Sequence, residues 1–436
     1  MSTQGPDRHA ERKARIRRRR IVAGVVAVVV VVLVIGAVGA LAGWFGKSKP
    51  ADKTAAAPSA AKVAANSRAA ALTSLGAWPT FGNTPGNTRA DTAVSSTLPF
   101  NTLWTANTGG LIELPPVIGA GRVIVANYGY GLAYDLHTGA RLWKRSLGSR
   151  LAASPALTGL PNTPSAGQPQ RVIFANQAGD VFANDPATGA QIWKVALGSS
   201  VETSPLVVGD GVFVGTRAGE VVRISLTSHK IVWQDAVAGS VKGAIADAGS
   251  HIIVGNYGGQ IEALDPSNGA VVWRTTAPSG YYSGSGRFYG AAAVAGGQVF
   301  AGNTNGAVLG INASTGAINW TAVTGGYVYS SPAVADGLVF LGSYDHNLYA
   351  FNAQNGHVVW HRDMGAPISG SPSVIGKMVW IATLGATAAS GHLYALDART
   401  GALDLTRQNG RYAAPVAVQG IIVAPGLDEI TALTPS

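Results

Sequence analysis

Short apolar runs separated by turn residues fill the chain from residue 100 to residue 436. The segment LVFLGS at 338–343 is typical, because leucine, valine and phenylalanine are followed at once by glycine and serine. Such runs are too short for amphipathic helices and are typical of β-strands. The 57 glycines of the chain agree with many tight turns between strands, so we expect an all-β protein.

A motif that ends in tryptophan organises these strands into repeats. Its clearest copies are AYDLHTGARLW (133–143), ANDPATGAQIW (183–193), ALDPSNGAVVW (263–273), GINASTGAINW (310–320) and AFNAQNGHVVW (350–360). Two copies are degenerate, RISLTSHKIVW (223–233) with His229 in place of glycine and ALDARTGALDL (395–405) with Leu405 in place of tryptophan. Successive tryptophan positions lie 40 to 50 residues apart, which is the period of a four-stranded propeller blade.

Third and fourth strands of the repeat can each be counted eight times. The predicted third strands are 133–135, 183–185, 223–225, 263–265, 310–312, 350–352, 395–397 and 432–434. The fourth strands carry Trp104, Trp143, Trp193, Trp233, Trp273, Trp320, Trp360 and Leu405. Because the first fourth strand precedes any third strand, we expect the N-terminal strand to complete the last blade and close the ring.

These counts predict an eight-bladed β-propeller with ring closure by the N-terminal strand. Its tryptophans are expected to serve structural docking between blades, and stacking of one of them on a cofactor is the alternative.

An apolar segment near the N-terminus predicts a membrane anchor. Residues 21–45 contain no charge, and as a helix they would span roughly 37 Å, enough for a hydrocarbon core of about 30 Å. Four arginines at 17–20 precede them, and positive flanks stay in the cytoplasm. The alternative is a cleaved signal peptide, although its apolar region would be about 7–15 residues long.

The expected organisation has four parts. Residues 1–20 form a basic cytoplasmic tail, 21–45 one transmembrane helix, 46–77 an alanine-rich linker and 78–436 the propeller. We therefore expect a single-pass protein of the cytoplasmic membrane, with its N-terminus inside and its propeller outside.

The charge distribution changes how the net charge of +10 is interpreted. Residues 1–20 hold eight basic and two acidic residues, whereas 78–436 hold 19 of each. Nucleic-acid binding needs a concentrated basic face, so the neutral body argues against a nucleic-acid partner. The chain has no cysteine, which excludes disulfides and thiolate chemistry, and its scattered histidines predict no metal site.

The repeat resembles the tryptophan-docking motif of pyrroloquinoline-quinone (PQQ)-repeat propellers over 100–436. The segment WPTFGNTPGNTR at 78–89 is also similar to the start of quinoprotein dehydrogenase domains. The family has two branches, PQQ-dependent dehydrogenases and non-catalytic propellers that include the assembly lipoprotein of the outer-membrane β-barrel machinery. The resemblance therefore implies either PQQ with calcium as cofactors or none.

The chain is closer to the non-catalytic branch. It lacks the vicinal cysteine pair of the alcohol dehydrogenases, a calcium-ligand cluster and the long insertions over the cofactor. One feature favours the dehydrogenases: VETSPLVVGDGVFV at 201–214 is similar to a blade motif that would make Glu202 a cofactor contact. We predict no cofactor and no catalytic residue, and keep a PQQ-dependent quinoprotein dehydrogenase as the alternative.

A propeller brings the starts of its innermost strands together around a central funnel. The residues predicted to line its mouth and bind a ligand are Glu113, Glu202, Lys242, Arg287, Tyr289, Tyr329, Arg411 and Tyr412. The loop GYYSGSGRFYG at 280–290 adds aromatic rings between glycines and serines, a composition that suits carbohydrate or peptide contact. The alternative is that these tyrosines only cap the channel.

Together these features predict a non-catalytic binding or scaffold module of the cell envelope. Its expected partner is an envelope protein or a cell-wall component, and its expected link to the membrane is the N-terminal helix.

Overall fold

The computed structural model describes residues 76–436, except for 96–97, 162, 386–390, 409 and 411. The predicted tail (1–20), the predicted transmembrane helix (21–45) and the predicted linker as far as residue 75 lie outside the described residues. All described residues belong to one compact unit. Within the described residues, no helix is long and apolar enough to span a membrane.

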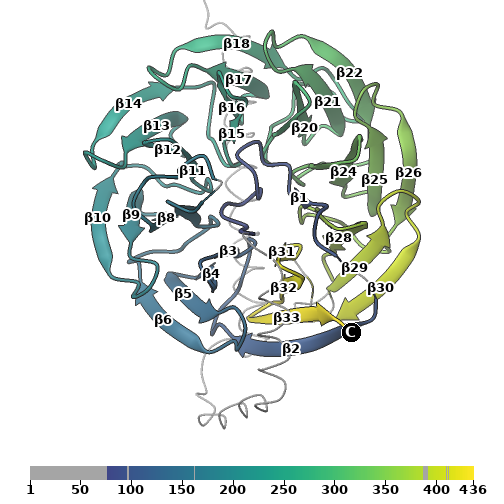
Figure 1. The fold of residues 1–436 in the computed structure, drawn as a ribbon. Coiled ribbons are helices and arrows are strands. Elements are labelled where there is room, and N and C mark those ends of the chain that lie inside the picture. Colours follow the sequence, from purple (N-terminus) through teal and green to yellow (C-terminus); the bar gives the residue numbers. More distant parts are fainter. Residues whose placement is uncertain (1–75, 96–97, 162, 386–390, 409, 411) are drawn as a thin grey trace, which may run out of the picture. The chain divides into compact units, whose positions relative to one another are not determined.

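Eight sheets stand in a ring around a central channel (Figure 1). They are numbered blades 1 to 8 in the order in which their innermost strands follow one another in the chain, from β3 to β31. The innermost strands are β3 (Val117–Gly119), β7 (Ala156–Thr158), β11 (Leu206–Val208), β15 (Ala246–Asp247), β19 (Ala293–Ala295), β23 (Ala333–Ala335), β27 (Ser373–Ile375) and β31 (Val416–Val418). The second strands are β4 (Arg122–Asn127), β8 (Arg171–Ala175), β12 (Gly211–Gly215), β16 (Ile252–Gly255), β20 (Gln298–Gly302), β24 (Leu338–Gly342), β28 (Met378–Ala382) and β32 (Ile421–Pro425).

The outer half of each blade follows the predicted repeat. The third strands are β5 (Tyr130–Asp135), β9 (Asp180–Asn184), β13 (Glu220–Ser225), β17 (Gln260–Leu264), β21 (Ala307–Asn312), β25 (Asn347–Asn352), β29 (His392–Asp397) and β33 (Glu429–Pro435). The outermost strands are β6 (Arg141–Ser146), β10 (Gln191–Ala196), β14 (Ile231–Ala236), β18 (Val271–Thr276), β22 (Ile318–Val323), β26 (Val358–Asp363), β30 (Leu403–Gln408) and β2 (Phe100–Asn107). The predicted all-β, eight-bladed propeller is confirmed.

Blade 8 joins a strand that precedes the first blade to the last strand of the chain. Strand β2 pairs antiparallel with β33, and Trp104 lies opposite Ala432. The predicted ring closure is therefore confirmed, and it pairs two strands that would otherwise be exposed sheet edges. A short strand, β1 (Ala90–Asp91), pairs in parallel with β27 and gives blade 7 a fifth strand.

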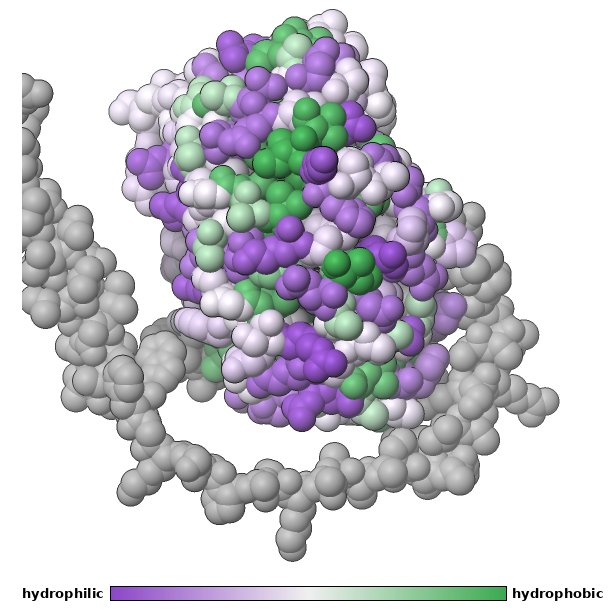
Figure 2. Space-filling view, turned by 90° about the vertical axis from the view of Figure 1, so that its left-hand side faces the viewer, coloured by the Kyte–Doolittle hydropathy of each residue, from purple (hydrophilic) through white to green (hydrophobic). Residues whose placement is uncertain are grey.

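Burial decreases from the middle of each blade to its outer rim. Strand β28 is buried along its whole length, whereas β6 buries only Trp143. On the side of the ring that carries β6, β10 and β14, apolar side chains are scattered among polar ones (Figure 2). Charged side chains such as Lys144 and Arg145 on these edge strands oppose sheet-to-sheet association.

The tryptophans of the outermost strands dock onto the next blade. The indole Nε1 of Trp320 donates a 2.9 Å hydrogen bond to the carbonyl oxygen of Ala353, and equivalent interblade bonds start from Trp104, Trp143, Trp233, Trp273 and Trp360. The Trp320 ring lies over Gly356, where any Cβ would collide with it and where φ is 73°. This turn therefore needs glycine both for its left-handed backbone and for the indole contact.

Two departures from the repeat have physical explanations in the ring. His229 replaces the turn glycine of blade 3 at a φ of 58°, and its ring stacks on Trp193 at a centroid distance of 5.5 Å. Leu405 stands where blade 7 would carry its tryptophan. The neighbouring blade 8 takes β33 and β2 from opposite ends of the chain, so no turn joins these strands. An indole at 405 would lack the turn residue on which the others pack, a glycine in six cases and His229 in the case of Trp193.

Residues 78–91, called the strap, cross the central channel (Figure 1). Backbone hydrogen bonds join the strap to the innermost strands of six blades, pairing Trp78 with Ile118, Pro79 with Leu157, Pro85 with Asp247, Gly86 with Val294, Thr88 with Val334 and Arg89 with Val374. The strap bends at Asn83 and Asn87, whose φ values of 64° and 55° are tolerated by asparagine better than by most residues. It therefore links blades on opposite sides of the ring.

Arg89 is the buried charge of the strap. Its guanidinium donates hydrogen bonds to the carbonyl oxygens of Pro372 at 2.6 Å and Ser371 at 3.3 Å in blade 7. A third bond of 3.0 Å reaches the carbonyl of Phe81, whose ring centroid lies 4.5 Å away. Burial lowers the pKa of Arg89 to about 9, so the side chain is still charged at neutral pH. Carbonyl dipoles stabilise this cation inside the ring.

Candidate functional site

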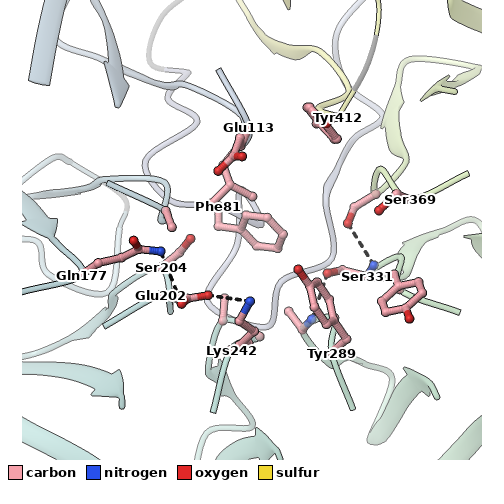
Figure 3. Close-up of a pocket in the computed structure, with 18 of the residues that line it drawn as sticks. Phe81, Glu113, Gln177, Glu202, Ser204, Lys242, Tyr289, Ser331, Ser369 and Tyr412 are labelled. Carbon is pink, nitrogen blue, oxygen red and sulfur yellow. Dashed lines mark hydrogen bonds and ion pairs between the residues drawn. The ribbon is translucent and has the colours of Figure 1, made fainter. Parts of the chain in front are cut away.

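The central channel widens on one face of the ring, called the funnel face, into a cavity of about 420 Å³ (Figure 3). Loops that lead into the innermost strands surround this cavity, as the repeat predicts. The predicted binding residues that line it are Glu113, Glu202, Lys242, Tyr289, Tyr329 and Tyr412. The structure therefore brings together side chains that lie up to 299 positions apart in the sequence.

The two remaining predicted residues differ from these six. Arg287 does not line the cavity; its guanidinium lies over the ring of Tyr257, 5.3 Å from the centroid. Arg411 lies outside the described residues.

One side of the cavity is a network of ion pairs centred on Glu202. Its carboxylate lies 2.6 Å from Lys242 Nζ and 2.9 Å from Arg217 Nη1, and the side chain is only 9% exposed. Burial favours the neutral carboxyl, but the hydrogen bonds and charges of these two cations outweigh it and hold the pKa of Glu202 below its ordinary value of 4.5. Glu202 is therefore ionised at neutral pH.

A second ion pair joins Glu113 to Arg150 at 2.5 Å. The Arg150 guanidinium also lies over the ring of Tyr128, 5.0 Å from its centroid. Both carboxylates that line the cavity are thus neutralised by cations, with three basic side chains against two acidic ones.

Sequence reasoning missed several lining residues. Arg217 and Gln177 come from hairpins between second and third strands, and these hairpins reach the cavity beside the predicted strand starts. Phe81 comes from the strap and projects into the middle of the ring of side chains (Figure 3). Arg150 lies in the loop that leads into β7, as Glu113 and Glu202 lie in the loops that lead into β3 and β11, and this place in an equivalent loop could have identified a further cation.

A serine followed by proline stands at the start of four innermost strands, at 154–155, 204–205, 331–332 and 371–372. These serines join neighbouring blades. The hydroxyl of Ser331 accepts a 2.9 Å hydrogen bond from the backbone N–H of Ala291, and Ser371 accepts an equal bond from the N–H of Ser331. Ser204 accepts in the same way from the N–H of Ser154. These hydroxyls hold the strand starts in place around the cavity, which explains the Ser-Pro pattern.

The two carboxylates of the cavity are not free to coordinate a calcium ion, because both are paired with cations. Calcium needs about 6–8 oxygen ligands, whereas the described residues contain no cluster of three or more histidine or acidic side chains. Glu202 and Glu113 already accept hydrogen bonds from cations, and a calcium ion beside Lys242 and Arg217 would be repelled by both.

Replacing Glu202 with glutamine is expected to make the free energy of unfolding depend less steeply on pH in the acidic range. Because the pKa of Glu202 is lowered in the folded state, its stabilisation is present above the unfolded value near 4.5 and is lost as pH falls through the folded value. Urea unfolding measured in steps below pH 5 should therefore show a shallower decline for Glu202→Gln than for the wild type. Glu113→Gln, which leaves Glu202 intact, is the control, and an equal change in that variant would refute the assignment.

Comparison with known proteins places the chain in a family. A family model described as outer membrane protein assembly factor BamB matches residues 132–287 and 257–424. No curated protein is significantly similar in sequence.

Solved structures share the fold at low identity. BamB from Moraxella catarrhalis is 21% identical with a TM-score of 0.63, over 77% of this chain and 100% of that chain. A europium-containing methanol dehydrogenase is 15% identical with a TM-score of 0.65, over 83% of this chain and 90% of that chain. The quinohemoprotein alcohol dehydrogenase from Comamonas testosteroni is 15% identical with a TM-score of 0.65, over 86% and 84%. With its repeats, ring closure and matched residues, the chain belongs to the PQQ-repeat β-propeller family that the BamB model describes.

Proposed function

We propose that this protein is a membrane-anchored, extracytoplasmic binding or scaffold module of the cell envelope, without catalysis of its own. The observation that carries the proposal is the neutralisation of Glu113 and Glu202 by cations. A general base needs a carboxylate free to accept a proton, and a metal site needs carboxylates free to coordinate. An open cavity without these groups suits recognition, so the funnel face is the proposed binding surface.

The proposed membrane anchor and the proposed partner are supported by different observations. The uncharged segment 21–45 after four arginines supports a single-pass anchor with the propeller outside the cytoplasm. The similar protein BamB is described as an outer membrane protein assembly factor, which favours an envelope protein as the partner over a cell-wall component.

Crosslinking in intact cells tests the proposal. The full chain, purified after crosslinking, should carry an envelope component, and the double variant Tyr289→Ala/Tyr329→Ala should recover about 10-fold less of it, because aromatic side chains at the centre of an interface carry much of its affinity. The variant Leu142→Ala removes an exposed apolar side chain of β6 on the outer rim and is the matched control. Recovery of the propeller alone, or equal losses in both variants, would refute the proposal.

A PQQ-dependent quinoprotein dehydrogenase is the second candidate. It is favoured by the place of Glu202 in the cavity wall and by the dehydrogenase structures that share the fold. Fold similarity by itself does not determine activity, because a shared fold supports many functions.

A further inference from the structure

Seven tyrosines form a connected cluster on the funnel face across blades 4 to 6. This tyrosine shelf consists of Tyr257, Tyr281, Tyr282, Tyr289, Tyr327, Tyr329 and Tyr344, whose neighbouring ring centroids lie 4.4–6.4 Å apart. Tyr281 is 60% exposed, Tyr282 36% and Tyr327 41%. Tyr289 and Tyr329 belong to both the shelf and the cavity, so the shelf extends the cavity wall outwards.

Buried asparagines hold the loop that carries three of the seven shelf tyrosines, Tyr281, Tyr282 and Tyr289. The side-chain amide of Asn305 donates 2.8 Å hydrogen bonds to the carbonyls of Pro278 and Gly284, and that of Asn303 donates a 3.0 Å bond to Ser285. Both asparagines lie in the hairpin between β20 and β21 and are buried. The loop is therefore preorganised, which lowers the entropic cost of binding through Tyr281 and Tyr282.

Two pairs of rings in the shelf are stacked on each other. Tyr282 stacks on Tyr327 with a centroid distance of 4.4 Å and an interplanar angle of 19°. Tyr257 stacks on Tyr289, and cations lie over both rings, Arg287 over Tyr257 and Lys242 over Tyr289.

This packing decides between classes of partner. A sugar ring stacks on a free aromatic face, whereas a protein segment also packs against ring edges and bonds to hydroxyl groups. Since a neighbouring ring covers one face of each of Tyr257, Tyr282, Tyr289 and Tyr327, these rings offer less free face to a sugar than unstacked tyrosines would. Tyrosine and arginine are also the residues enriched at protein interfaces and their hot spots.

The charge around the shelf indicates which protein segment would bind. Within the described residues, no carboxylate lies within ion-pair distance of Arg287, and Arg217 and Lys242 share the single carboxylate of Glu202. The nearby acid Asp345 accepts 2.6 Å hydrogen bonds from the Tyr349 hydroxyl and the Gly325 N–H, and these neutral donors leave its negative charge in place. The three cations Arg217, Lys242 and Arg287 against the two carboxylates of Glu202 and Asp345 leave the charge beside the shelf net positive, by one.

We propose that the tyrosine shelf, with Arg287, is the docking surface for an acidic segment of a partner protein. The proposal rests on the proposed binding function and specifies its partner. Acidic side chains of the segment would pair with Arg287 and neighbouring cations, while its apolar side chains pack against the exposed tyrosines Tyr281, Tyr282 and Tyr327.

A displayed peptide library tests this proposal with a defined probe. Random 12-residue peptides on phage are selected on the full chain in detergent micelles, and enriched sequences are synthesised for affinity measurement. Enriched peptides should be rich in aspartate and glutamate, and Tyr282→Ala/Tyr327→Ala should weaken their binding about 10-fold or more. The matched control Tyr128→Ala/Tyr130→Ala removes two exposed tyrosines of blade 1, which lie under cations as well.

Arg287→Gln should weaken the same peptides and reduce the dependence of their affinity on salt, because exposed charges are screened within about 10 Å at 0.1 M salt. Unchanged melting curves would show that each variant remains folded.

Four results would overturn the proposal: no enrichment, enrichment of neutral or basic peptides, equal losses in the control variant, or binding of an oligosaccharide array in place of peptides. One result separates the two proposals. If a crosslinked partner is lost in Tyr289→Ala/Tyr329→Ala but retained in Tyr282→Ala/Tyr327→Ala, docking on the tyrosine shelf is refuted, whereas binding at the funnel face is still supported.

Discussion

Replacing Arg89 with leucine is expected to destabilise the propeller by about 3–5 kcal/mol, because hydrogen bonds from a charged donor are each worth about 1.5–3 kcal/mol and unpaired buried carbonyls are costly. The guanidinium serves three carbonyl oxygens, two in blade 7 and one in the strap itself. Leucine would leave these oxygens buried without donors and would weaken the attachment of the strap to blade 7, where only the backbone pairing of β1 with β27 would remain. Urea unfolding of the full chain, followed by tryptophan fluorescence, measures the loss.

Two controls separate this effect from a general loss of charge. Arg89→Lys keeps the charge but presents a single ammonium, so its stability should lie between that of the wild type and that of Arg89→Leu. Arg171→Leu removes an arginine whose guanidinium bonds at the surface to the carbonyl of Gln170, and it should change stability by less than about 0.5 kcal/mol. If Arg89→Leu is as stable as Arg171→Leu, the strap does not brace the ring.

Truncating Trp320 to alanine is expected to cost about 3–5 kcal/mol, as for other large aromatic side chains removed from a packed core. Its ring packs on Phe300 within blade 5 and on Gly356 in blade 6, and its Nε1 bonds to Ala353. Loss of the indole therefore removes a contact within one blade and a contact between two. Thermal unfolding of the full chain should show a clear fall in melting temperature.

Leu405→Ala is the matched control, because position 405 is the same place in the repeat. The Leu405 side chain is partly buried against the core between blades 7 and 8, and no turn glycine faces it there. Its truncation should cost less than half as much as that of Trp320. Equal losses would contradict the explanation that leucine stands at 405 because blade 8 lacks the turn.

Periodicity made the ring predictable. Each repeat contains the same pattern of strand, turn and tryptophan, so eight blades and their closure through Trp104 follow from counting. The sequence shows that His229 and Leu405 depart from the repeat motif, but it does not show the structural cause of either departure. One depends on a ring stacking across blades, and the other on the pairing of β2 with β33 in blade 8.

The candidate site was predictable only where it follows the repeat. The strand starts place Glu113, Glu202 and Tyr329 around the cavity at equivalent positions of three units. Phe81 and Arg89 belong to a segment that occurs once, so no internal comparison indicates that it crosses the channel. The tyrosine shelf joins loops of three blades, and such contacts depend on tertiary packing that a repeat pattern does not encode.

Titration with PQQ and calcium tests most directly the central claim that the funnel face binds a partner and does not catalyse oxidation. The melting temperature of the purified full chain is measured across increasing PQQ at fixed calcium, with an apo quinoprotein dehydrogenase as positive control. A ligand that binds only the folded state raises stability with its concentration, by about 2.7 kcal/mol at 100 times its Kd. We expect no shift for this protein and a clear shift for the control. A saturable rise in its melting temperature, with turnover of an alcohol or sugar in a dye-linked assay, would contradict the account.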